Sequence, residues 1–135
     1  MEIKKKYLLL LSFFIPLAVM TACMAIFQVG PFGSNSFLII DGLHQYMPFF
    51  SVLYDKLKEG GSLFYSFRAG LGINFLSLFS YYLSSPLNLF ILLFDKTQLN
   101  MAVSLLVVLK IALSGLTAGI YFTSKTKKPG ITVLV

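Results

Sequence analysis

Two long apolar runs constrain this chain more than any other feature of its sequence. The first covers residues 7–29, and as a helix it would measure about 34 Å, enough to cross a bilayer. The second covers residues 101–123 and is interrupted only by Lys110 near its middle. Because backbone polar groups in lipid must be satisfied within their own segment, such runs predict transmembrane helices. The sequence therefore predicts an all-α integral membrane protein with two transmembrane helices.

The composition supports a membrane protein and argues against other classes. Hydrophobic residues make up 57% of the 135 positions and charged residues only 12%, unlike a soluble domain. A single cysteine, Cys23, rules out an intramolecular disulfide and a cysteine metal cluster. The basic start also resembles a signal peptide, but residues 7–29 exceed a typical h-region and no convincing cleavage site follows. We therefore expect an uncleaved membrane anchor.

The basic residues flank the apolar runs rather than forming a stripe, so the net charge of +6 does not indicate nucleic acid as a partner. Residues 4–6 precede the first run, and Lys125, Lys127 and Lys128 follow the second. By the positive-inside rule, residues 1–6 and 124–135 are expected in the cytoplasm and residues 30–100 outside. The outer region carries four basic and four acidic side chains and is formally neutral. This asymmetry supports the orientation.

The outer region is expected to contain an amphipathic helix over about residues 43–59, lying along the membrane surface. Pro48 removes a backbone donor, so the regular helix is expected to begin near it, and Gly60 with Gly61 is expected to end it. Asp55 falls on the polar side of the helical wheel. The apolar arc comprises Leu43, Tyr46, Met47, Phe50, Leu53, Tyr54 and Leu57.

Residues 69–94 carry no charge and are long enough for a third span. Against a third span, the segment Ser84–Pro86 with Asn88 breaks the run, and a third span would move the C-terminal lysines outside. The sequence favours two short helices lying in the outer interface or dipping into it. In the second transmembrane run, small residues suit close packing against other helices, namely Ser114, Gly115, Ala118 and Gly119.

Asp41 is the main candidate for chemistry, because it follows the first span by about a dozen residues and should lie near the outer membrane surface. A carboxylate there can accept a proton from a hydroxyl or bind a divalent cation held by a phosphate. The alternative is that Asp41 caps the helix that starts near Gly42, for which aspartate is a preferred residue. His44, Gln45 and Tyr46 lie close enough in sequence to share a site with it. Asp41 and His44 alone would supply only two metal ligands, so the metal remains unknown.

Two basic residues are further candidates for substrate binding. Arg68, beside Gly70 and Gly72, could bind a phosphate, although a positive charge near anionic lipid needs no such role. Lys110 lies in mid-span, where a lysine costs about 2.5–3.5 kcal/mol, so it should face a partner helix or a cavity. A structural ion pair or a snorkelling amine would explain it equally well.

The order of motifs resembles the N-terminal part of the bacterial YfhO membrane protein family. After a first span come "DGLHQYMPF", "FRAGLGIN" and "SYYLSSPLNLF", and then a span containing "LLVVLKIALSGL". The resemblance implies a polytopic glycosyltransferase of the GT-C type, which transfers a sugar from an undecaprenyl-phosphate carrier on the outer face of the membrane. The acceptor implied is a cell-envelope polymer such as teichoic acid.

In such enzymes an essential acidic residue lies in the first outer loop, and Asp41 is the residue at that position. Its implied role is to orient the acceptor hydroxyl or to act as its general base. Family members are several times longer, so we expect the chain to be an N-terminal portion that requires further transmembrane helices. The alternative is a small non-catalytic membrane protein, such as an assembly or flippase subunit, in which Asp41 is only a helix cap.

Overall fold

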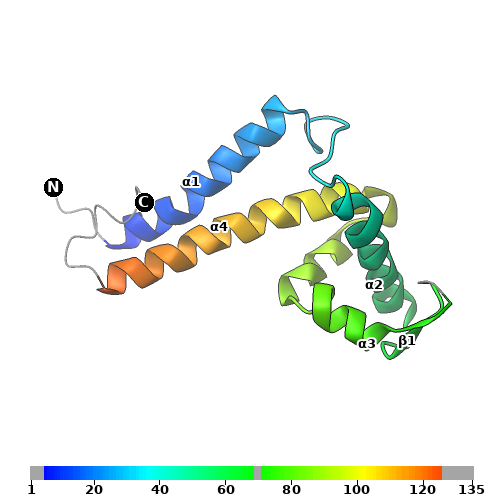
Figure 1. Cartoon of the computed structure of the whole chain (residues 1–135). Coiled ribbons are helices and arrows are strands. Elements are labelled where there is room, and N and C mark those ends of the chain that lie inside the picture. The colour runs from blue at the N-terminus through cyan, green and yellow to red at the C-terminus, as the bar shows by residue number, and fades with distance from the viewer. Residues whose placement is uncertain (1–4, 69–70, 126–135) are drawn as a thin grey trace. The chain divides into compact units, whose positions relative to one another are not determined.

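The computed structural model describes residues 5–68 and 71–125. Internal contacts divide the chain into two units, the first made of Met1–Gln28 with Val107–Val135 and the second of Val29–Leu106. Predictions that rest on Lys4, Gly70, Lys127 or Lys128 fall outside the described residues. Helices dominate both units, so the all-α membrane fold is confirmed (Figure 1).

The two long helices are each apolar enough to cross a membrane. Helix α1 covers Lys5–Ile26 and contains Pro16, and helix α4 covers Leu99–Lys125. By length and composition, the candidate spans are Lys5–Ile26 and Lys96–Lys125. Most of α1 is exposed apolar surface, including Leu10, Phe14 and Val19, which lipid tails would cover.

The first unit is held by a close approach between α1 and the C-terminal part of α4, which run side by side (Figure 1). A Cβ atom added at Gly115 would lie 2.8 Å from Cγ of Pro16 and would also meet the carbonyl oxygen of Ser12. A Cβ added at Gly119 would lie 2.7 Å from Cβ of Ser12. The predicted small-residue packing is therefore present at these two glycines, whereas Ser114 and Ala118 are exposed.

The second unit begins with a π-helical segment, Gly42–Tyr46, that continues directly into helix α2, Met47–Glu59. Pro48 lies in the first turn of α2, where it has no N–H to donate to a carbonyl of the preceding π-helical turn. Gly60 ends the helix in the left-handed conformation, with φ of 75°. These helix limits follow the local signals of the sequence.

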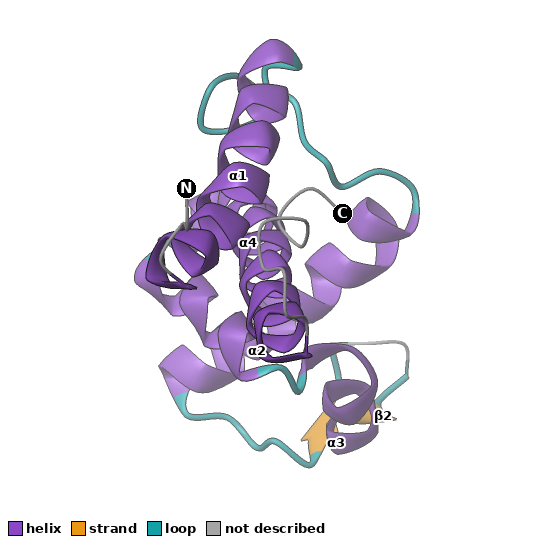
Figure 2. Ribbon diagram, turned by 90° about the vertical axis from the view of Figure 1, so that its left-hand side faces the viewer, coloured by secondary structure: helices purple, strands orange, loops and turns teal. Residues whose placement is uncertain are grey.

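A small hairpin and short helical segments complete the second unit. Strand β1, Tyr65–Ser66, pairs antiparallel with β2, Ile73–Asn74, and helix α3, Phe75–Leu78, follows at once (Figure 2). The Asn74 side chain caps α3 by accepting hydrogen bonds from the backbone N–H groups of Leu76 and Ser77. The sequence had not indicated this hairpin. A π-helical segment, Phe79–Leu83, and 3₁₀ segments, Pro86–Leu93 and Lys96–Gln98, then lead to α4.

The segment 69–94 is sharply bent at the predicted break. The helical stretches Phe75–Leu83 and Pro86–Leu93 meet at 95°, and the Asn88 side chain bridges the bend by donating to the Leu83 carbonyl at 3.0 Å. A bend of this kind belongs either to a broken span or to a re-entrant loop. The placement of the segment relative to the membrane stays a prediction.

The core of the second unit collects side chains from helices that are distant in sequence. The helical-wheel prediction is wrong for Asp55, which is only 5% exposed because two cations pair with it. Buried Val52 also lies outside the predicted apolar arc. The buried cluster comprises Phe50, Val52, Leu53, Tyr54, Phe75, Leu83, Ile91, Leu99, Val103 and Leu106.

Candidate functional site

Asp41 lies at a sharp change of backbone direction before α2. The preceding residue, Ile40, has φ of 49°, a left-handed conformation that is rare for a β-branched side chain. The Ile40 carbonyl nevertheless accepts a hydrogen bond from the backbone N–H of His44 at 2.9 Å, so the strained residue begins the helical turn. This reversal places Asp41 at the start of the helical segment.

The Asp41 carboxylate is exposed and does not cap the helix. Its backbone is already helical, with φ of −62° and ψ of −32°, whereas a capping residue normally has an extended backbone. Within the described part of the chain, its side chain makes no cap hydrogen bond. The capping alternative therefore lacks the interaction that would explain an aspartate here. The carboxylate is exposed to solvent.

The residues after Asp41 join an aromatic cluster formed with the bent segment. Gln45 donates a hydrogen bond from Nε2 to the Tyr82 hydroxyl at 3.0 Å. The Tyr46 ring packs edge-to-face on the Tyr82 ring, with centroids 4.8 Å apart. The Tyr81 ring also packs edge-to-face on Tyr82, with centroids 4.2 Å apart. Two of the predicted site residues are therefore held in place by Tyr82.

Tyr82 was not among the predicted site residues, because its separation of 37 residues from Gln45 hid the contact. Burial raises the pKa of the Tyr82 hydroxyl, and the neighbouring Tyr81 adds to this shift. The Tyr82 hydroxyl oxygen can accept the hydrogen bond from Gln45 while its own O–H donates to a second partner.

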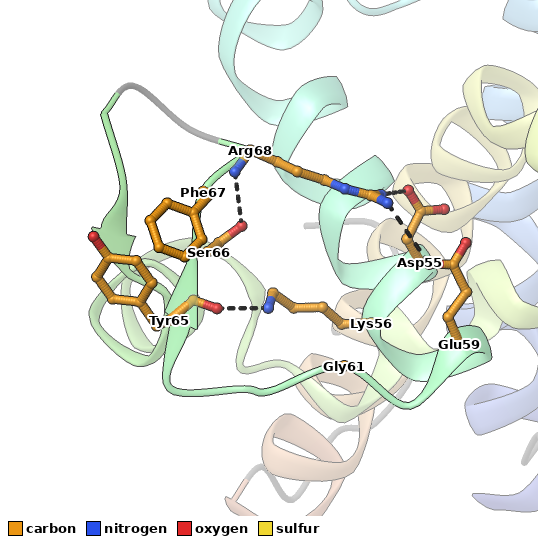
Figure 3. Close-up of a pocket in the computed structure, with 8 residues that line it drawn as sticks. All are labelled: Asp55, Lys56, Glu59, Gly61, Tyr65, Ser66, Phe67 and Arg68. Carbon is orange, nitrogen blue, oxygen red and sulfur yellow. Dashed lines mark hydrogen bonds and ion pairs between the residues drawn. The ribbon is translucent and has the colours of Figure 1, made fainter.

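Arg68 lies in a second group of contacts, formed with the C-terminal half of α2 (Figure 3). Its guanidinium pairs with the buried carboxylate of Asp55 and lies 3.6 Å from a carboxylate oxygen of Glu59. Lys96 pairs with the same Asp55 oxygen at 2.7 Å. Because two carboxylates already accompany Arg68, a phosphate there would compete with them, and the phosphate role stays a prediction.

A scan against protein-family models matches residues 12–135 to the family described as bacterial membrane protein YfhO. The chain belongs to the YfhO family. No curated protein and no solved structure matches it. The match covers most of the first candidate span, all of the second span and the whole second unit, so membership of this membrane family agrees with the observed fold.

In this YfhO-family chain the remaining predicted site residues are His44 and Lys110. His44 is exposed at the π-helical segment beside Asp41. Among the described residues, no three His, Cys, Asp or Glu side chains are grouped so that they could hold a metal ion. Lys110 lies half-buried in the first unit, where its carbonyl accepts a hydrogen bond from Ser114 at 2.9 Å. Its role in substrate binding stays a prediction.

Proposed function

We propose that this YfhO-family chain is the N-terminal module of a membrane glycosyltransferase. It would transfer a sugar from an undecaprenyl-phosphate carrier to a cell-envelope acceptor, such as teichoic acid, on the outer face of the bacterial membrane. Both ends of the module would lie in the cytoplasm, with residues 30–100 outside. One observation carries the proposal. The Asp41 carboxylate, in the segment that follows the first span, is exposed and makes no helix-capping hydrogen bond.

The proposed reaction needs one acid–base group on the acceptor side. The acceptor hydroxyl oxygen forms a bond to the anomeric carbon of the sugar, and the bond from that carbon to the carrier phosphate breaks. The hydroxyl proton passes to Asp41, and the electron pair leaves with the lipid phosphate. The main task of Asp41 is to orient the hydroxyl, since an exposed carboxylate is a weak base. Gln45 and Tyr46, fixed by Tyr82, would contact the same substrate.

The test replaces Asp41 by Asn in the full-length protein and measures sugar transfer from a polyprenyl-phosphate sugar in membranes that contain it. We expect transfer to fall by at least about 100-fold, since a positioned acid–base group contributes about 10²–10⁴-fold. Membrane insertion and stability should be unchanged, because the side chain makes no cap hydrogen bond.

Asp95 provides a matched control. It is also exposed, precedes a short helical segment and makes no side-chain cap hydrogen bond. Asp95→Asn should retain transfer. If Asp41→Asn and Asp41→Ser both retain full transfer, Asp41 has no catalytic role and a non-catalytic membrane subunit becomes the better description.

A further inference from the structure

The contacts of Arg68 form one wall of a pocket of about 270 Å³ between the hairpin and the end of α2 (Figure 3). The opposite sides are formed by Lys56 and Glu59 from α2 and by Tyr65 and Phe67 from the hairpin. All these residues belong to the second unit. The pocket therefore does not depend on how the two units are arranged.

The charges that line the pocket cancel. Asp55 and Glu59 supply two carboxylates, and Lys56 and Arg68 supply two cations, so the formal sum is zero. Asp55 is buried and satisfied by Arg68 and Lys96, and Lys56 donates to the Tyr65 carbonyl at 2.8 Å. The Glu59 side chain is 66% exposed and keeps acceptor capacity, while Arg68 keeps spare N–H donors. Such a lining suits a neutral ligand that both donates and accepts hydrogen bonds.

Two aromatic rings at the edge of this pocket are exposed. Tyr65 lies on β1 and Phe67 directly follows this strand, and their ring centroids lie 4.8 Å apart at 71°. Phe67 is 79% exposed, although apolar rings are normally buried. Exposed ring faces beside paired acidic and basic groups can pack on the C–H face of a ligand whose edge carries hydroxyls.

The closeness of Tyr65 to β2 shows that the pocket is a built feature of the hairpin. Gly72 has φ of 109°, and a Cβ atom added there would lie 2.8 Å from Cζ of the Tyr65 ring and would also overlap its hydroxyl oxygen. The Ser66 side chain between the two aromatic residues is buried and accepts from the backbone N–H of Arg68 at 3.3 Å. These contacts hold Tyr65 and Arg68 at the pocket.

We propose that this pocket binds a single neutral sugar ring, with its C–H face on Phe67 and Tyr65 and its hydroxyls on Glu59 and Arg68. A free phosphate or another anion fits less well, because Arg68 is already paired with Asp55 and Glu59 and the exposed Glu59 carboxylate would repel an anion. The proposed glycosyl transfer provides a use for the site, but the binding rests on the pocket's own chemistry. The ring could belong to the carrier-linked sugar or to a sugar on the acceptor polymer.

The chain contains no tryptophan, so a single introduced tryptophan reports its own surroundings. The reporter is Phe67→Trp, and the matched control is Phe64→Trp. The Phe64 side chain is 73% exposed and lies near the same strand, but it does not line the pocket. Both variants are placed in phosphatidylcholine nanodiscs and titrated with methyl α-D-glucopyranoside, methyl α-D-galactopyranoside and sodium phosphate. We expect a saturable emission change only at residue 67 and only with a glycoside.

Glu59→Gln in the Phe67→Trp background should weaken glycoside binding about tenfold, through loss of a charge-assisted hydrogen bond. Saturation-transfer NMR on the unsubstituted chain repeats the binding measurement without the tryptophan reporter. In this measurement Phe67→Ala should weaken glycoside binding about tenfold, whereas Phe64→Ala should leave it unchanged. Several results would overturn the proposal: no glycoside response by either method, a response to phosphate alone, or equal responses at residues 64 and 67. If the tryptophan emission of both variants is blue-shifted and does not change when glycosides are added, the hairpin lies in lipid and the proposal is also overturned.

Two further probes distinguish the source of the sugar. Tighter binding of glucose linked to a short prenyl phosphate assigns the pocket to the donor sugar, and tighter binding of glucosyl-glycerol assigns it to the acceptor. Binding is measured without transfer, so the two proposals can fail separately. If glycosides do not bind but Asp41→Asn still abolishes transfer, only the sugar pocket is wrong.

Discussion

The buried carboxylate of Asp55 allows a quantitative test of how the second unit is held together. Arg68 and Lys96 both pair with it, and their side chains are 55% and 52% exposed. Replacing either cation by Met keeps most of the aliphatic stem and leaves the other cation in place. Each single replacement should cost about 1 kcal/mol, because half-exposed partners are well hydrated when the pair is lost.

The double variant Arg68→Met/Lys96→Met should cost far more than the two single variants together. It leaves a carboxylate that is 5% exposed without either cation, and an uncompensated buried charge costs about 3–5 kcal/mol. The excess over the sum of the singles should therefore be about 1–3 kcal/mol. Adding Asp55→Asn to the double variant removes the stranded charge and should recover part of this loss.

Hydrogen exchange of the α2 amides in nanodiscs measures the free energy of opening for this unit. Glu59→Gln is the control, since the Glu59 side chain is 66% exposed and should contribute at most about 1 kcal/mol. If the double variant costs only the sum of the singles, or if Asp55→Asn gives no recovery in that background, Asp55 is not the buried centre of an ion-paired group.

Two further predictions concern the membrane-spanning part and its orientation. Gly115→Leu should destabilise the contact between α1 and α4 by about 1–3 kcal/mol in a thermal unfolding measurement, because Ser12 and Pro16 leave no room for a side chain. Ala118→Leu on the exposed side of α4 is the control, and equal effects of the two variants would contradict the close approach. For orientation, Thr97→Cys in a Cys23→Ala background should react with a membrane-impermeant maleimide from outside the cell, and labelling only after lysis would reverse the proposed topology.

The sequence alone was sufficient for the features that depend on local chemistry. A long apolar run in lipid must be helical to satisfy its own backbone, so α1 and α4 could be predicted from residues 7–29 and 101–123. The start of α2 near Pro48 and its end at Gly60 follow from backbone constraints of single residues. Asp41 could be placed before that helix because Pro48 marks where the helix starts. Its lack of a helix-capping hydrogen bond could not be foreseen from the sequence.

The contacts that build the candidate sites were decided by tertiary structure. Arg68 and Lys96 reach Asp55 across 13 and 41 residues, and Tyr82 reaches Gln45 across 37. Helical periodicity describes one segment at a time, so it assigned Asp55 to a solvated face and could not connect Tyr82 with Gln45. The two-residue strands of the hairpin are likewise too short to leave a periodic signal. Local sequence determined which segments are helical, whereas the folding back of the chain determined which of their polar groups meet, because those pairings depend on residues that no local pattern connects.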